Sequence, residues 1–291
     1  VIYLDCTQLP SPSNSITHHK VELRTVECSF AILNDSLEIF TCTECGLGIA
    51  NPMPNKEDLD KYYSGGLYYD KSLNPFNKEF FEFSLDLARS RLRIIENNIP
   101  AQETISRVID IGAGNGAFGC LIANQSSNLE YDIVEPDRQV GLGSKNWVTN
   151  LYSSIEGVAE NYYDLVLVCQ VLEHVPNPVQ FLEKISTMLV PGGYLYIDVP
   201  FKDYYFKEKV EPHVLFWTEE SLTKALKSLG TEILLCDTYG MNWRKAKKFF
   251  STRKFDKLTD PWNYTALLNR MSGRLLGSRP ANEFSRFDAD S

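Results

Sequence analysis

The chain has 291 residues, a formal net charge of −9 and 43% hydrophobic residues. This length suffices for one large domain with a smaller appendage, and the composition is that of an ordinary globular protein. The acidic balance argues against nucleic acid as a partner, and no apolar run is long enough to cross a bilayer. The N-terminus also lacks the basic-then-apolar layout of a secretion signal, so we expect a cytoplasmic protein without a membrane span.

The N-terminal segment is predicted to be a small ribbon-like and helical appendage. Apolar and polar residues partly alternate over 21–43, which predicts an antiparallel hairpin. The hairpin closes in a knuckle-like turn at Cys42-Thr-Glu-Cys45. Asn55 is placed to cap a short helix, and a longer helix is predicted over 76–98 from the near-helical spacing of its apolar residues.

Strand and helix patterns then alternate along the chain. The predicted strands cover 107–111, 131–135, 163–169, 194–199 and 232–236. The predicted helices cover 116–125, 137–146, 177–189 and 218–229. Several strands are apolar throughout, as expected when helices cover both faces of a sheet. The pattern predicts an α/β fold with a doubly wound, mostly parallel, Rossmann-like sheet.

This organisation divides the chain into three predicted parts. They are an N-terminal segment and lid over 1–75, a cofactor-binding domain over 76–240, and a basic extension over 241–291. The extension carries 11 Lys and Arg against 5 Asp and Glu. It is either a solvated helical surface or a contact for an acidic substrate or partner.

The strongest chemical signal is a strand that runs into the glycine-rich turn Gly112-Ala-Gly-Asn-Gly116. Glycines let a ligand approach the main chain closely, and ligands of such sheets bind beyond the carboxyl ends of the strands. The glycine spacing also fits a dinucleotide-binding pattern. Asp110 decides against it, because an acid at the strand end accepts hydrogen bonds from an ammonium and repels a pyrophosphate. S-adenosylmethionine carries such an ammonium.

A second acid, Glu135, ends the next predicted strand, nineteen residues after Gly116. An acid at this position can accept hydrogen bonds from both ribose hydroxyls of a nucleoside cofactor. Alone it would be read as a surface carboxylate, but its pairing with the glycine turn favours the functional reading. Because both candidate cofactors contain a ribose, Glu135 does not separate them.

From Ser106 to Tyr239 the sequence resembles the class I S-adenosylmethionine-dependent methyltransferases. The similar segments, in family order, are D-I-G-A-G-N-G, V-E-P-D, Y-D-L-V-L-V-C-Q-V-L-E-H-V-P-N-P and L-V-P-G-G-Y-L-Y-I-D-V-P. The resemblance implies S-adenosylmethionine as cofactor. The implied contacts are Asp110, Gly112, Ala113, Gly114, Gly116, Glu135 and Pro136, with Cys169 and Gln170 beside the methionine portion.

The knuckle at Cys42 and Cys45 resembles half of the zinc ribbon that precedes some sugar methyltransferases. The similarity continues through Asn51-Pro-Met-Pro54 to a tyrosine cluster. Upstream, where those proteins have a second C-x-x-C, this chain has only irregularly spaced candidates, namely Cys6, His18, His19 and Cys28. Because a zinc site needs four ligands, the knuckle either binds zinc or is a metal-free relic.

The candidate general bases are histidines in loops expected at the carboxyl edge of the sheet. His213 follows the predicted fifth strand with Glu211 nearby, and His174 follows the strand before it. Each is either a base or a histidine that anchors its loop; imidazole has a suitable ordinary pKa near 6.5. Tyr68 and Tyr69 either donate hydrogen bonds to an acceptor or pack as aromatic residues. No carboxylate cluster indicates a catalytic magnesium site.

These observations predict methyl transfer to a small polar acceptor, with a nucleotide-linked or polymer-linked sugar favoured. The alternatives are O-methylation of a lipid or aromatic metabolite, a noncatalytic interaction module, and a nicotinamide-dependent oxidoreductase, which Asp110 disfavours. The sequence leaves open whether oxygen, nitrogen or carbon is methylated, and it leaves open the oligomeric state.

Overall fold

The computed structural model describes residues 21–27, 36–64, 78–100, 104–123, 128–137, 147–201 and 213–238. These residues fall into two units. The first unit contains the described residues up to Met53, Leu172–Val179 and the described residues from Asp198 onward. The second contains the described residues of Pro54–Val171 and Gln180–Ile197. The three-part division predicted from the sequence stays a prediction.

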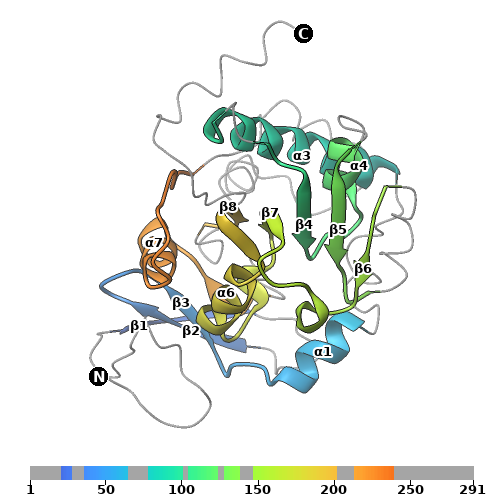
Figure 1. Cartoon of the computed structure of the whole chain (residues 1–291). Helices are drawn as coiled ribbons and strands as arrows, with labels where there is room; N and C mark the ends of the chain where they lie inside the picture. Colours follow the sequence, from blue (N-terminus) through green and yellow to red (C-terminus); the bar gives the residue numbers. More distant parts are fainter. Residues whose placement is uncertain are drawn as a thin grey trace, which may run out of the picture. The chain divides into compact units, whose positions relative to one another are not determined.

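The second unit is built on a five-stranded sheet of order β6-β5-β4-β7-β8 (Figure 1). Its strands are β4 Arg107–Ile111, β5 Glu130–Val134, β6 Leu151–Tyr152, β7 Tyr163–Cys169 and β8 Leu189–Asp198. The β4–β5, β4–β7 and β5–β6 pairs are parallel. The predicted doubly wound, Rossmann-like sheet is therefore confirmed.

The chain order of the strands reverses at β4, which has β5 on one side and β7 on the other. Such a reversal is the topological switch point at which open α/β sheets bind ligands. Ile109, Ile133 and Leu167 are fully buried in the three central strands. The apolar strands thus supply the core, as their lack of alternation predicted.

The helices of this unit follow the predicted pattern closely. They are α1 Lys56–Ser64, α3 Lys78–Asn98, α4 Ala117–Ala123 and α6 Pro178–Ser186, the last from Gln180 onward. Asn55 caps α1 as predicted, since its Oδ1 accepts a hydrogen bond of 2.8 Å from the Asp58 amide. α3 packs against α4 (Figure 1). No helix in the described part of the chain is long and apolar enough to span a membrane.

The first unit has its own sheet, of order β1-β2-β3-β9. Its strands are β1 Val21–Glu27, β2 Ser36–Cys42, β3 Gly48–Asn51 and β9 Leu215–Phe216, and its helix is α7 Glu219–Lys227. The predicted hairpin is confirmed as the antiparallel β1–β2 pair. The sequence missed β3, because a strand of four residues before a proline-rich spacer offers too few alternations to be recognised.

Two further predictions differ from the structure. Residues 232–236 form no strand, and of this apolar run Leu235 alone is buried. A strand needs a hydrogen-bonded neighbour as well as an apolar sequence, and the described neighbours provide none here. β8 begins at Leu189, so Pro191–Gly193 lies inside the strand and not before it. Most of the predicted helix 137–146 and all of 241–291 lie outside the described residues.

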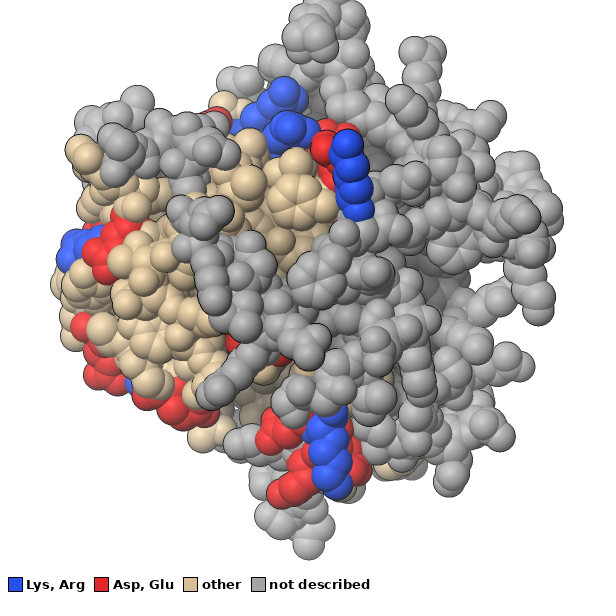
Figure 2. All heavy atoms as spheres, turned by 90° about the vertical axis from the view of Figure 1, so that its right-hand side faces the viewer, with Lys and Arg blue, Asp and Glu red and all other residues tan. Residues whose placement is uncertain are grey.

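Over the described part of the face in Figure 2, acidic and basic side chains occur in small mixed groups separated by uncharged surface. The described residues include the ion pairs Arg89–Asp86, Lys184–Glu160 and the partly buried Arg107–Asp164. Exposed pairs such as Arg89–Asp86 contribute at most about 1 kcal/mol each. The stability of the second unit therefore rests mainly on its buried sheet.

Gly119 in α4 offers a direct test of this packing. A Cβ atom there would lie 1.9 Å from the Trp147 ring, far inside van der Waals contact. We expect Gly119→Ala to lower the free energy of unfolding by about 1–3 kcal/mol, the usual cost of overpacking a core. Gly157→Ala is the matched control, because its Cβ would meet Tyr152 at an ordinary 3.9 Å. Urea titrations of both variants check this, and equal midpoints would contradict the packing of Trp147.

Candidate functional site

The turn between β4 and α4 has a backbone that only glycine adopts readily. Gly112, Gly114 and Gly116 have φ values of 71°, 54° and 72°. The Gly112 amide donates a hydrogen bond of 2.8 Å to the Val134 carbonyl, which ties the turn to the end of β5. The predicted cofactor turn is therefore a fixed loop at the switch point, with Ala113 in its middle.

This turn also lies against the chain that leaves β7. A Cβ atom on Gly112 would come within 2.4 Å of the Val171 side chain. Ile111 pairs with Val168, so the carboxyl ends of β4 and β7 are level with each other. Cys169 and Gln170 follow at this edge, both partly exposed, and Gln170 has a φ of 59°. The structure thus brings together the glycine turn and the two residues predicted beside the methionine portion of the cofactor.

Glu135 directly follows β5 and reaches back to the glycine turn. Its two carboxylate oxygens accept hydrogen bonds from the Gly114 amide, at 2.9 Å, and from the Asp137 amide, at 3.0 Å. Burial raises the pKa of Glu135 to about 7, although both amide hydrogen bonds oppose the rise. A carboxylate has about four acceptor sites, so two donors leave room for two more, such as the hydroxyls of a ribose. Pro136, between the two acids, is exposed.

Asp110 is also buried, with 3% of its surface exposed. The Tyr131 hydroxyl donates a hydrogen bond of 2.9 Å to its Oδ2. Burial raises the pKa of Asp110 to about 7, and the hydrogen bond from Tyr131 opposes the rise. The sequence identified Asp110 but missed Tyr131, which reads as an ordinary strand residue until the sheet register places it beside β4. A cationic group would stabilise the ionised carboxyl in this surrounding.

The residues of this site fit S-adenosylmethionine. Its two acids and glycine turn would hold the ammonium and the ribose, and Gly112 lies so close to Val171 that a side chain there would clash and displace the turn. All of these residues belong to the second unit.

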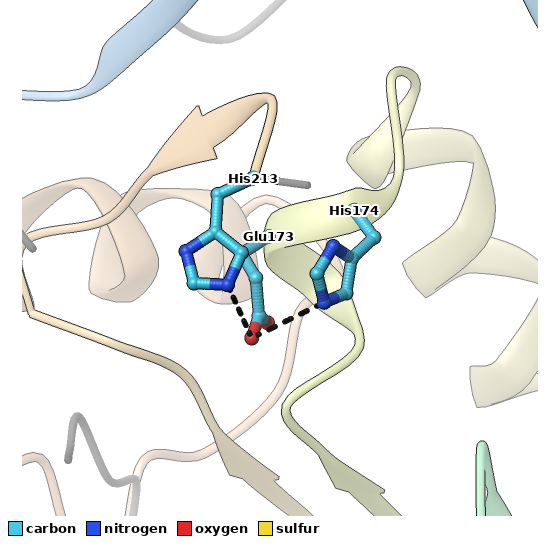
Figure 3. A group of neighbouring side chains, drawn as sticks. All are labelled: Glu173, His174 and His213. Atoms are coloured by element: carbon cyan, nitrogen blue, oxygen red, sulfur yellow. Dashed lines mark ion pairs between the residues drawn. The ribbon is translucent and has the colours of Figure 1, made fainter. Parts of the chain in front are cut away.

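The first unit contains a separate cluster, formed by Glu173, His174 and His213 (Figure 3). The carboxylate of Glu173 lies between the two imidazoles. His174 Nε2 is 3.7 Å from Glu173 Oε1, and His213 Nε2 is 4.0 Å from the same oxygen. The two rings meet edge to face, with centroids 4.9 Å apart. All three side chains are largely buried. The exposed fraction is 1% for Glu173, 11% for His174 and 9% for His213.

Hydrogen bonds of the backbone hold this cluster in place. Glu173 and His174 lie in the 3-10 turn η2, Leu172–His174, and the Val214 amide donates to the Glu173 carbonyl at 2.9 Å. The Val214 carbonyl in turn accepts from the Ala50 amide of β3 at 2.9 Å. The structure therefore brings together both predicted histidines and adds Glu173, which the sequence did not single out.

The other predicted site residues are only partly described. Glu211, Tyr68 and Tyr69 lie outside the described residues, and so do Cys6, His18, His19 and Cys28. Cys42 and Cys45 are buried in a turn closed by a 2.8 Å hydrogen bond from the Gly46 amide to the Cys42 carbonyl. Neither forms a disulfide. The predicted knuckle is thus an ordered turn, and its zinc site stays a prediction.

Comparison with known proteins supports the assignment of the fold. A family model described as "Methyltransferase domain" matches residues 83–235. The chain is 28% identical over 134 residues to a ubiquinone biosynthesis O-methyltransferase of Xanthomonas oryzae, covering 43% of this chain and 49% of the relative. A Vibrio cholerae protein of the same name is 28% identical over 98 residues, covering 31% and 40%. The chain thus spans about half the length, or less, of these curated relatives.

Among solved structures, the fold is similar to the putative methyltransferase in complex with the Trm112 methyltransferase activator of Haloferax volcanii. The TM-score is 0.53 at 12% identity, and the match covers 78% of this chain and 100% of that chain. This likeness concerns the fold alone. The family match covers more than half of the 291 residues and includes the glycine turn, both acids and β7. The chain therefore belongs to the methyltransferase domain family, as its resemblance to S-adenosylmethionine-dependent methyltransferases predicted.

Proposed function

We propose that this protein transfers a methyl group from S-adenosylmethionine to a small polar acceptor. The observation that supports it most is the pair of buried acids, Asp110 and Glu135, held by hydrogen bonds at the glycine-rich turn. Asp110 would accept from the ammonium of the cofactor and Glu135 from its ribose hydroxyls. The bound cofactor supplies an activated methyl group on a sulfonium. The protein must then align the acceptor, exclude water and take up any proton that the acceptor loses.

The cluster of Glu173, His174 and His213 is our candidate for the group that takes up the proton lost by the acceptor. Glu173 and His174 follow Cys169, the last residue of β7, by only four and five residues along the chain. His213 is tied to this turn through the Val214–Glu173 backbone hydrogen bond. Among the described residues, Glu173 is the acid beside His213 and could orient it. The predicted role of Glu211, which lies outside the described residues, stays a prediction.

Two acceptor classes have specific support. A nucleotide-linked or polymer-linked sugar is favoured by the similarity of residues 42–69 to sugar methyltransferases. An aromatic or lipid acceptor with a hydroxyl group is favoured by the curated relatives, which are named ubiquinone biosynthesis O-methyltransferases. Turnover with radiolabelled S-adenosylmethionine against a panel of both classes tests this choice. A protein that binds the cofactor and methylates neither class would be the noncatalytic module.

Cofactor binding can be tested at Glu135. We expect Glu135→Ala to weaken S-adenosylhomocysteine binding by about 1–3 kcal/mol, through the lost charge-assisted hydrogen bonds. Isothermal titration calorimetry measures the change. Glu160→Ala is the matched control, because this acid pairs with Lys184 at the surface, where 57% of its side chain is exposed. Equal affinities in the two variants would remove Glu135 from the ribose site.

The zinc content of the purified protein tests the knuckle at Cys42 and Cys45. If Cys42 and Cys45 contribute to a zinc site, protein purified without chelator should contain about one equivalent of zinc that is lost in the Cys42→Ser/Cys45→Ser variant. Normal folding without zinc would instead make the knuckle a metal-free turn.

A further inference from the structure

We propose that Glu173, His174 and His213 form a binding site for one divalent transition-metal ion. The set contains two imidazole nitrogens and one carboxylate oxygen, whose donor atoms all lie within 4.8 Å of one another. Imidazole and carboxylate together suit zinc, iron(II), manganese or cobalt, and three protein ligands leave positions open for water or substrate. The site goes beyond the proposed methyl transfer, since metal binding requires neither cofactor nor acceptor.

The distances within the cluster favour a bridging ion over direct hydrogen bonds. A hydrogen bond between an imidazole and a carboxylate would bring nitrogen and oxygen to about 2.7–3.2 Å. The measured separations are 3.7 Å and 4.0 Å, which exceed that range for both histidines. Ligands about 2.1 Å from a tetrahedral ion are about 3.4 Å apart. The two measured separations exceed this spacing by about 0.3 and 0.6 Å, and the donor atoms lie within 4.8 Å of one another, so the imidazoles would have to move closer by up to about an ångström to hold an ion at these distances.

The location of the cluster fits a metal site in two further respects. Its ligands come from two chain segments, the turn η2 and the residue before Val214, which a backbone hydrogen bond of 2.9 Å joins. The segments are anchored by neighbours that are almost fully buried, including Leu172, Val214 and Leu215. Such rigid support holds ligands near the geometry that an ion requires.

A metal in this position would give the cluster a role in the proposed function. For an acceptor whose hydroxyl oxygen reaches the ion, the ion would bind that oxygen and lower the pKa of the hydroxyl, and the proton would pass to solvent water. His213 would then act as a ligand in the loaded protein. This role rests on the proposed methyl transfer, whereas the binding site itself does not.

Cobalt(II) titration of the full chain, prepared with a chelator and without a histidine tag, tests the site. We expect about one equivalent to bind with visible ligand-field bands and without the near-ultraviolet bands of thiolate ligation. His174→Ala and His213→Ala should each bind at least about 100-fold more weakly, because even the outer partners of metal ligands contribute about 10- to 100-fold. Glu173→Gln, which keeps the shape and removes the charge, should also weaken binding.

Two control variants separate this site from the other candidate ligands. His18→Ala/His19→Ala removes the remaining histidines of the chain, which has four, and should bind cobalt as the wild type does. Cys42→Ser/Cys45→Ser should likewise retain the ligand-field bands. Melting temperatures without metal show whether each variant folds. Because His174 is the least buried of the three residues, His174→Ala should disturb folding least.

Cobalt that binds with thiolate bands and survives His174→Ala would assign the metal to the cysteines and overturn the proposal. Absence of any cobalt binding in the wild type would overturn it as well. In both cases S-adenosylhomocysteine binding is measured on the same preparation. Because that binding depends on Asp110 and Glu135, its retention would leave the proposed function standing while the metal site fails.

Discussion

Methyl transfer by the His213→Asn variant is expected to be about 10²- to 10⁴-fold slower than by the wild type, the usual contribution of a positioned base. Asparagine keeps a similar size and hydrogen-bonding capacity but has no nitrogen that accepts a proton or binds a metal strongly. The imidazole is lost whether it acts alone or as a ligand, so the expected loss is the same for both roles. Single-turnover measurements with saturating S-adenosylmethionine report this step directly.

The same preparation supplies the controls. The affinity for S-adenosylhomocysteine should stay within about threefold of wild type, because the proposed cofactor contacts, Asp110 and Glu135, belong to the second unit and His213 does not. His19→Asn serves as a matched substitution outside the cluster. If His213 only anchors its loop, we expect different results for His213→Asn, namely a lower melting temperature and an unchanged rate per folded molecule. That outcome would remove His213 from the reaction.

The proposed cofactor site could be located in the sequence because its signals are local. Asp110 stands two residues before the glycine turn, and Glu135 directly follows the next strand, so both positions follow from the strand–turn–helix pattern alone. What the pattern omits is Tyr131, whose hydroxyl holds Asp110. This contact depends on the neighbouring strand and not on sequence spacing.

The histidine cluster contains an acid that the sequence did not identify. The sequence paired His213 with Glu211 because the two are close along the chain, and Glu211 lies outside the described residues. Among the described residues the acid beside His213 is Glu173, forty residues away, joined to it through the backbone hydrogen bond between Val214 and Glu173. Such a pairing arises from tertiary packing, for which neither residue carries a local signal. The tripeptide Leu172-Glu173-His174 was visible, but its glutamate read as an ordinary turn acid.

The missed strand β3 has the same origin. Gly48–Asn51 pairs with β2 on one side and β9 on the other, and β9 contributes only Leu215 and Phe216. Neither segment alternates long enough to be recognised alone. Each is stabilised by its neighbours, because the backbone groups of one strand satisfy those of the next. The predicted strand at 232–236 is the converse error, an apolar run that forms no strand with any neighbour in the described part of the chain.

The affinity for S-adenosylhomocysteine should rise with pH between about 5.5 and 7.5. Burial raises the pKa of Asp110 and of Glu135 to about 7, from ordinary values near 4. In the free protein below pH 7 both carboxyls therefore hold protons that the unfolded chain has lost, so stability falls as pH rises from about 4 to 7. An ammonium at Asp110 and hydroxyls at Glu135 favour the ionised acids instead, so binding below pH 7 must release protons.

Calorimetry in buffers of different ionisation enthalpy measures this release. At pH 6 we expect between one and two protons per bound ligand, with the affinity rising up to about tenfold per pH unit for each proton released. Asp110→Asn retains an acceptor for the Tyr131 hydroxyl but cannot ionise, so it should bind more weakly and release about one proton fewer. Its free form should also lose part of the decline in melting temperature between pH 5 and 7. If the wild type binds without releasing protons, and with an affinity that is flat from pH 5.5 to 7.5, then neither buried acid changes its charge on binding. The ammonium would in that case lie away from Asp110.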